Sequence, residues 1–189
     1  MFDVAIIGGG PAGYLAAERL GHAGKKVLLI EKSQLGGTCL NVGCIPTKTL
    51  LNSAKQYIHA LEAHKFGVHA EQVRYDWNEI MNWKNDVVQK LRGGVASQMK
   101  RFSVTVAEGS GEILRKRSGS TPALVRVHSD AEKGKETEYE CKAILVSTGS
   151  VPAMPPIPGA RDNPALVDST ALLSVSEVPK RLAVIGGGV

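Results

Sequence analysis

The sequence predicts an α/β fold in which a parallel sheet with its helices is joined to a small antiparallel β-meander. Near the N-terminus, two short apolar runs, residues 2–7 and 26–30, enclose a helical stretch at 14–23. A strand–helix–strand order of this kind places the two strands parallel in one sheet. Residues 103–146 instead contain short strand-like segments separated by polar turns, which is typical of an antiparallel meander. With 43% apolar residues among 189, the chain can bury a sizeable core.

A glycine motif links the first predicted strand to the first helix. Gly8, Gly10 and Gly13 form G-x-G-x-x-G directly after the first apolar run. Glycines at this spacing allow a tight turn and let the backbone approach a pyrophosphate, whose charge the following helix N-terminus attracts. Glu31 closes the second strand, where a carboxylate can accept hydrogen bonds from ribose hydroxyls. Glu31 alone would be an ordinary surface carboxylate, but the complete order predicts a dinucleotide site in a Rossmann-like domain.

The segment from Gly36 to Lys48, GGTCLNVGCIPTK, carries two cysteines five positions apart. A ring closed by Cys39 and Cys44 would stabilise the fold by only about 2 kcal/mol, less than a bridge between distant segments. The start of the sequence has no basic region of a secretory signal, so we expect no oxidising compartment that would maintain a structural disulfide. The pair therefore predicts electron chemistry. The alternatives are two small buried residues in a glycine-rich turn, or a zinc site, whose paired-ligand pattern the sequence lacks.

The residues that follow Cys44 favour a reactive thiol. Pro46 suits the first turn of a helix, so Cys44 is expected at a helix N-terminus, where the macrodipole favours a thiolate. Lys48 lies one turn later on the same face, and its positive charge acts in the same direction. Apolar residues then recur at helical spacing, at Leu50, Leu51, Ala54, Tyr57, Ile58 and Leu61.

The cysteine segment resembles the redox-active disulfide motif of the FAD-dependent pyridine nucleotide–disulfide oxidoreductases. Within that family, Leu40, Ile45 and the run 47–51 are most similar to the dihydrolipoamide dehydrogenases, whereas glutathione and mercuric reductases usually carry valine at the first two places. The resemblance implies that Lys48 lies beside the reactive edge of a flavin. It also implies that the Cys44 thiol faces the flavin ring and that Cys39 exchanges with substrate.

FAD is the expected cofactor at the glycine motif. Because the disulfide segment begins five residues after Glu31, a dinucleotide with its adenosine at Glu31 would direct its far end toward the cysteines. A flavin at that end can carry the two electrons of a disulfide. The expected contacts of FAD in this part of the chain are Gly8, Gly10, Pro11, Ala12, Gly13, Glu31, Lys32, Gly36, Gly37, Thr38, Cys39 and Lys48.

Two later segments complete the expected site by resemblance. EGSGEI follows a strand-like run at 104–107, and the corresponding backbone in the family contacts the adenine, which implies Ser110 and Gly111. STGS follows the apolar run 143–146 and resembles the family's second FAD signature near the pyrophosphate. That likeness implies three further contacts, Thr148, Gly149 and Ser150, although such a turn after a strand is common by itself.

Composition indicates which partners to exclude. The net charge of +5 suits an acidic partner, but the basic residues are dispersed, and the densest run, 115–117, adjoins a Ser-Gly-Ser turn typical of a solvated loop. We therefore expect no nucleic acid partner. No apolar run approaches the length of a membrane span, so we expect no membrane contact and a cytoplasmic location. No metal site is expected, and Cys141 is interpreted as a small buried apolar residue.

A long helix is predicted to begin near Asp76, with Glu79 completing a capping box. Gly93 and Gly94 are expected to weaken or bend it. Its core-facing residues are expected to be Trp77, Ile80, Met81, Val87, Val88, Leu91, Val95 and Met99. In the meander, a polar hairpin tip is expected at 130–135.

The C-terminal part indicates how the chain is organised. We expect an FAD-binding domain with the redox disulfide at 1–150, a linker at 151–180 and the start of an NAD-binding domain at 181–189. Within the last segment, residues 181–185 are strand-like, and the three glycines that follow begin a second glycine motif.

Members of the resembled family continue with an NAD-binding domain, a segment that completes the FAD domain, and an interface domain. The resemblance therefore implies the N-terminal part of a homodimeric enzyme that oxidises a lipoyl dithiol and reduces NAD. Two alternatives stay open at this point. The 189 residues can act as a non-catalytic flavin-binding or apo module, or the parent can resemble a glutathione or mercuric reductase.

Overall fold

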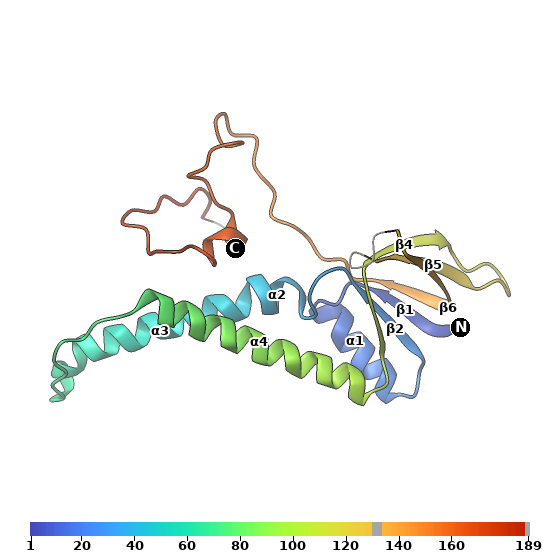
Figure 1. Cartoon of the computed structure of the whole chain (residues 1–189), viewed down its shortest axis with the longest axis horizontal. Coiled ribbons are helices and arrows are strands. Elements are labelled where there is room, and N and C mark those ends of the chain that lie inside the picture. Colours follow the sequence, from blue (N-terminus) through green and yellow to red (C-terminus); the bar gives the residue numbers. More distant parts are fainter. Residues whose placement is uncertain (130–133, 188–189) are drawn as a thin grey trace.

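The computed structural model describes residues 1–129 and 134–187, in which a helical hairpin extends from a sheet (Figure 1). Within these residues, a six-stranded sheet has the order β3-β2-β1-β6-β5-β4. The strands are β1 (Phe2–Ile7), β2 (Val27–Glu31), β3 (Thr105–Glu108), β4 (Ser110–Arg115), β5 (Ala123–His128) and β6 (Glu136–Val146). The helical segments are α1 (Pro11–His22), α2 (Gly37–Val42), α3 (Cys44–Glu62), the 3₁₀ turn η1 (Ala63–Phe66), α4 (Trp77–Arg101) and α5 (Ser169–Leu172).

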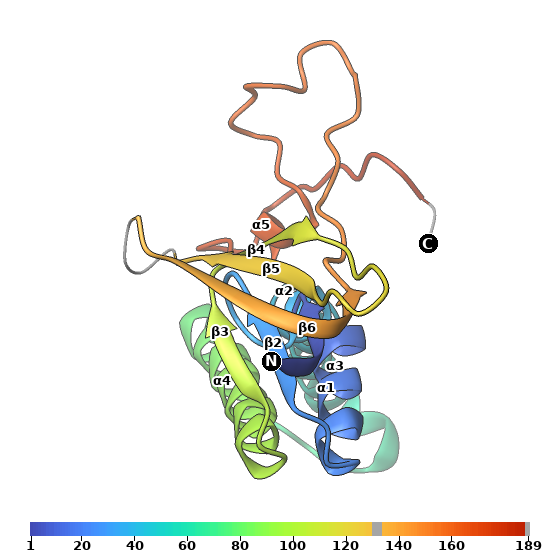
Figure 2. The ribbon, with the colours of Figure 1, turned by 90° about the vertical axis from the view of Figure 1, so that its right-hand side faces the viewer.

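The strand–helix–strand unit at the N-terminus forms as the sequence predicts. β1 and β2 pair in parallel, with Ile6 opposite Leu29. Helices α1 and α4 cover the same face of these strands (Figure 2). On this face, Ala17 of α1 and Met99 of α4 belong to one buried cluster with Ile6, Val27 and Leu29. The alternation of strand side chains therefore gives β1 and β2 one face for the helices and a second face that needs its own cover.

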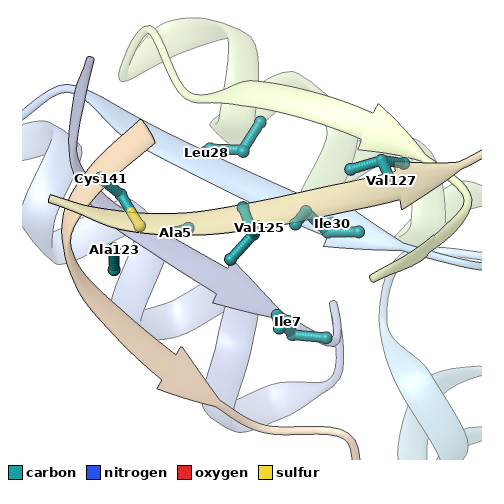
Figure 3. Close-up of a cluster of buried hydrophobic side chains, with 8 residues drawn as sticks. All are labelled: Ala5, Ile7, Leu28, Ile30, Ala123, Val125, Val127 and Cys141. Carbon is teal, nitrogen blue, oxygen red and sulfur yellow. The ribbon is translucent and has the colours of Figure 1, made fainter. Parts of the chain in front are cut away.

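The antiparallel meander β4–β5–β6 covers that second face. The first half of β6 pairs antiparallel with β5, and its second half pairs in parallel with β1. The change of partner occurs at Cys141, which pairs with both Phe2 and Ala123 and is fully buried, as the sequence predicts. The sheet thereby folds over itself and encloses the core drawn in Figure 3, formed by Ala5, Ile7, Leu28, Ile30, Ala123, Val125, Val127 and Cys141.

The predicted extent of the meander, residues 103–146, is wrong at its start. β3 lies at the far edge of the sheet and pairs in parallel with β2, with Thr105 opposite Leu28. Val104, just before β3, is buried in the cluster beneath α1 and α4, and its N–H donates to the carbonyl oxygen of Met99. These contacts of Val104 hold the start of β3 against α1 and α4. A local strand pattern carries no information about such long-range packing. Of the expected hairpin tip, residues 130–133 lie outside the described residues.

Helices α3 and α4 form the hairpin that extends beyond the sheet (Figure 1). Asp76 caps α4 as predicted, because its carboxylate accepts a hydrogen bond from the N–H of Glu79 at 3.1 Å. Most of the expected apolar face of α4 is at least half-buried, but Leu91 is 42% exposed. On α3, the helical spacing is confirmed, yet four of its expected apolar positions are exposed, namely Leu51, Ala54, Ile58 and Leu61.

The weakening or bend expected at Gly93 and Gly94 does not interrupt α4. α4 is one continuous helix of 25 residues, and both glycines lie within it. Each glycine costs a helix only about 1 kcal/mol relative to alanine. The buried contacts of Val88, Val95 and Met99 on either side hold the helix together against that cost.

Residues 147–187 are irregular apart from α5, and part of this segment lies against α4. The indole N–H of Trp77 donates to the carbonyl oxygen of Val175, and the Lys84 ammonium donates to that of Leu173. Burial lowers the pKa of Lys84, because it disfavours the charged form. The strand expected at 181–185 is absent from the described residues, which show exposed, irregular backbone there. A strand needs a neighbouring strand to pair with, and residues 181–185 are not part of the described sheet. No helix of the described ranges is long and apolar enough to cross a membrane.

We predict that replacing Gly94 with alanine stabilises the chain by about 0.5–1 kcal/mol, because alanine loses less conformational entropy in a helix. A Cβ at Gly94 meets nothing within 4 Å. Gly24 is the matched control, since a Cβ there is equally free but its φ of 72° is left-handed. Gly24→Ala is expected to destabilise by roughly 1 kcal/mol. Chemical denaturation measures both changes, and a loss of stability in Gly94→Ala would contradict the prediction.

Candidate functional site

The candidate site lies at the carboxyl end of β1, where three backbone segments meet. Gly8 has a φ of 105°, and a Cβ there would overlap the carbonyl oxygen of Ser147, which follows β6. A Cβ at Gly13 would overlap the carbonyl oxygen of Gly8. Ser147 also joins the segments directly, because its N–H donates to Ile7 at 2.8 Å and its hydroxyl lies 2.9 Å from the carbonyl oxygen of Gly8. The fold therefore requires glycine at positions 8 and 13, independently of any ligand.

The N-terminus of α1 points into this junction with free backbone donors. Gly10 is its N-cap and makes no side-chain cap, and the first turn contains no acidic residue. Pro11 has no N–H, so the amides of Ala12 and Gly13 are the first available donors. Pro11 and Ala12 are exposed. This arrangement can bind an anion such as a phosphate through backbone N–H groups and the helix dipole.

Glu31 fixes the loop before α1. One carboxylate oxygen accepts a hydrogen bond from the N–H of Gly9 at 2.6 Å, and the other accepts from the N–H of Ser33 at 2.9 Å. Sequence reasoning expected Glu31 to accept from a ribose. Each carboxylate oxygen has two lone-pair directions, so a ribose hydroxyl can still donate to Glu31 while these contacts remain. Glu31 thus has a structural task besides any ligand contact.

A cavity of about 240 Å³ lies beside Glu31. Pockets that enclose a whole drug-sized ligand have roughly 300–1,000 Å³, so this cavity suits one part of a longer ligand. It joins the ends of β1, β2 and β6 to the start of β4, segments that lie far apart in the sequence. Its lining residues are Ile7, Gly8, Ile30, Glu31, Lys32, Gly109, Ser110, Gly111 and Thr148.

The first residues of the cysteine segment lie directly on the glycine loop. The N–H of Gly36 donates to the carbonyl oxygen of Gly9 at 2.8 Å. A Cβ at Gly37 would lie only 2.6 Å from the Cα of Gly10. Gly37 opens α2, a short helix that sequence reasoning missed, and Thr38 and Cys39 follow in its first turn. The two glycine loops therefore pack backbone to backbone, with the cysteines at one end of the contact.

Cys39 and Cys44 form a disulfide with their Cα atoms 4.6 Å apart, which confirms the predicted pairing. Cys44 is the first residue of α3, and Gly43 before it provides no side-chain cap. Pro46 lies in the first turn of α3, as expected, and is buried there. Lys48 lies four residues after Cys44 and is exposed. Cys44 is also exposed, whereas Cys39 is half-buried.

The third expected segment, STGS, follows β6, and its predicted contacts with a pyrophosphate stay a prediction. Thr148 lines the cavity, but Gly149 and Ser150 are exposed and do not line it. Sequence reasoning missed Gly9, whose N–H contacts Glu31, and Ser147, whose place as the first residue of the STGS turn was a usable signal. It also missed Asn41 and Arg92. The side chain of Arg92 donates to Asn41 between the two cysteines, and no local pattern signals that contact.

Fold and site together define an α/β dinucleotide-binding domain with a disulfide beside its phosphate loop. Residues 2–189 match the family described as pyridine nucleotide-disulphide oxidoreductase, and the chain belongs to this family. The match confirms the resemblance carried by the cysteine segment and the glycine motif.

Two relatives and one solved structure show how far the likeness extends. The dihydrolipoyl dehydrogenase of Mycoplasma pneumoniae is 42% identical over 192 residues, which cover 100% of this chain and 39% of that enzyme. The dihydrolipoyl dehydrogenase of Bacillus subtilis is 39% identical over 186 residues, covering 98% of this chain and 37% of that enzyme. The HOCl-induced flavoprotein disulfide reductase RclA of Escherichia coli has a TM-score of 0.74 at 34% identity, covering 94% of this chain and 35% of that chain. This chain thus spans less than two-fifths of the length of each.

We predict that Gly13→Ala destabilises the chain by about 3 kcal/mol, because the added methyl group would overlap the carbonyl oxygen of Gly8. Gly10→Ala is the matched control. Gly10 has extended backbone that alanine adopts freely, and a Cβ there lies 3.7 Å from its nearest neighbour. Denaturation of both variants is the measurement. Equal stability of Gly13→Ala and Gly10→Ala would contradict the proposed crowding.

A second prediction concerns the three cysteines. Burial raises the pKa of the Cys141 thiol, and only a thiolate reacts readily with iodoacetamide. After reduction, we expect labelling of Cys39 and Cys44 in the folded chain and of Cys141 only in denaturant. Mass spectrometry of the labelled peptides measures this, with the denatured chain as the control. Labelling of Cys141 in the folded chain as fast as Cys44 would contradict its burial.

Proposed function

We propose that this chain provides the FAD-binding domain and the redox-active disulfide of a dihydrolipoyl dehydrogenase. In the proposed reaction, the two thiols of dihydrolipoamide become a disulfide while the Cys39–Cys44 disulfide becomes a dithiol. The two electrons then reduce NAD, which takes up a hydride, and one proton is released. FAD, when bound, supplies the two-electron carrier between the cysteines and NAD.

Support comes first from the contact between the two glycine loops. Gly36 donates to Gly9, and Gly37 packs on Gly10, so a ligand with its phosphates at the N-terminus of α1 lies next to the cysteine segment. The cavity beside Glu31 and Ser110 lies at the same strand ends and suits the adenosine part of that ligand. A dinucleotide fits this arrangement. A dinucleotide whose far end accepts electrons can exchange them with the neighbouring disulfide.

The two sulfurs have different surroundings, which supports separate roles. Cys44 is exposed at the N-terminus of α3, where the helix dipole stabilises a thiolate, and is the sulfur that the flavin ring covers in this proposal. Cys39 exchanges with the dithiol substrate. Lys48, one turn after Cys44 on α3, adds positive charge near the reactive flavin edge.

The identity to the dihydrolipoyl dehydrogenases supports the choice of dihydrolipoamide and NAD. We assign residues 1–150 to the FAD-binding domain, 151–180 to a linker and 181–189 to the start of an NAD-binding domain. Of the last segment, Gly188 and Val189 lie outside the described residues. The assignment includes a homodimeric parent enzyme and a cytoplasmic location, where a disulfide that cycles between two states is reduced and reoxidised by its own substrates.

Protection of one cysteine by FAD tests the proposal. In the reduced chain, we expect FAD to slow alkylation of Cys44 by roughly tenfold or more and to leave Cys39 reactive, because the ring would cover only one sulfur. AMP is the matched control ligand, since it can occupy the cavity without reaching the cysteines. Peptide mass spectrometry measures each rate, and absence of Cys141 labelling shows that the chain stays folded.

Protection of Cys44 by AMP as strong as by FAD would contradict the proposed orientation, and absence of protection at any FAD concentration would contradict the FAD site. The same labelling measures how fast a thiol substrate reduces the disulfide when dihydrolipoamide replaces the chemical reductant. We expect dihydrolipoamide to reduce the Cys39–Cys44 disulfide faster than glutathione at equal thiol concentration. The reverse order would contradict the substrate assignment.

A further inference from the structure

We propose that Arg92, acting through Asn41, holds the cysteine segment in place and thereby stabilises the Cys39–Cys44 disulfide against reduction. This role depends on the proposed function only in that the disulfide must be reducible. Arg92 is a positioning residue, because among the described residues its side chain donates hydrogen bonds to Asn41 and not to either sulfur.

Asn41 lies in α2, between the two cysteines, and uses both ends of its side-chain amide. The Nδ2 group donates to the carbonyl oxygens of Gly37 at 2.9 Å and Leu35 at 3.1 Å. The Oδ1 atom accepts from Arg92, from Nε at 3.0 Å and from Nη2 at 2.8 Å. An arginine can only donate and a carbonyl can only accept, so these partners permit one orientation of the amide.

Arg92 connects this amide to α4. It is half-buried on that helix, and among the described residues it forms no ion pair with a carboxylate. Its planar guanidinium presents two N–H groups in a fixed direction, which suits the holding of one oxygen. The guanidinium therefore holds a neutral amide and neutralises no carboxylate of the described residues, so its contact fixes the position of Asn41.

The segment needs such support from outside. α2 has only 6 residues and is flanked by Gly36 and Gly43, neither of which caps it with a side chain. A helix this short is not stable by itself in water. Two contacts with α4 hold it, namely the burial of Leu40 with Val88 and Val95 and the hydrogen bonds from Arg92 to Asn41.

A link to the disulfide follows from shared geometry. The Cys39–Cys44 bond and the Arg92–Asn41 contact restrain the same short helix, so each makes the other less costly in conformational entropy. When the Arg92 contact is lost, the two thiols meet less often and the disulfide is easier to reduce. By reciprocity, reduction of the disulfide weakens the Arg92 contact by the same factor.

Arg92→Met tests this role in the 189-residue chain, equilibrated in buffers of reduced and oxidised dithiothreitol and quenched by alkylation. We expect the equilibrium to shift about fivefold toward the dithiol, the size expected for one net hydrogen bond. Lys90→Met is the matched control. It removes the same charge from an exposed position two residues away on the same helix and should cause no shift.

A double-mutant cycle separates positioning from a direct effect of charge. If Arg92 acts through Asn41, then Asn41→Ala shifts the equilibrium toward the dithiol and adding Arg92→Met changes it no further. If the Arg92 charge instead stabilises the thiolates directly, Arg92→Met shifts the equilibrium toward the disulfide, also in the Asn41→Ala background. That result, or no shift relative to Lys90→Met, would overturn the proposal.

The pH dependence of Cys44 alkylation tests separately for a direct effect of the Arg92 charge, because its midpoint reports the pKa of the Cys44 thiol. We expect its midpoint to be the same in Arg92→Met and the wild type, whereas a direct charge effect would raise it in the variant. If Arg92→Met does not fold, Arg92→Lys carries the test. It keeps the charge and most of the stem but lacks the planar fork, and we expect a smaller shift in the same direction. No shift in that variant would overturn the role. A disulfide that dithiothreitol cannot reduce would instead contradict the proposed function.

Discussion

Backbone crowding at the carboxyl end of β1 is the constraint on which the site depends. Gly8, Gly13 and Ser147 lie so close that a methyl group on either glycine would overlap a carbonyl oxygen. This close approach brings the end of β6 against the loop after β1 and sets the N-terminus of α1 at the strand ends. Glu31 then anchors Gly9, and Gly9 accepts from Gly36. The glycine loop after β1 and the cysteine segment are therefore parts of one packed backbone unit.

Two further connections determine how this unit is supported. β6 pairs with β5 and then with β1, and the change of partner at the fully buried Cys141 carries the meander over the parallel strands. Because β4 begins in that meander, Ser110 reaches the cavity beside Glu31. On the other side, α4 supports α2 through Leu40 and Asn41. The reactive segment thus has little stability of its own and takes its geometry from elements far away in the sequence.

Much of the site is predictable because its chemistry is local in sequence. The order of strand, G-x-G-x-x-G, helix and second strand determines the first βαβ unit, and β1 has the bounds that its apolar run predicts. Two cysteines five positions apart can reach each other where the chain turns between them, as it does at Gly43, and they are bonded. Asp76 caps α4 through a contact three residues away. For the disulfide and the helix cap, the atoms that interact lie within a few residues of each other in the sequence.

Only the tertiary structure decided which distant elements meet. The strand pattern at 105–108 fits either the meander or the parallel edge, and burial of Val104 beneath the helices selects the edge. The exposed irregular backbone at 181–185 shows the same dependence, since an apolar run becomes a strand only beside a partner. Arg92 and Asn41 lie 51 positions apart, so no local pattern could pair them. Sequence by itself determined the chemistry of the cysteine and glycine segments. Long-range packing decided which elements support them, because a hydrogen bond or a buried contact depends on distance in space and not on separation in sequence.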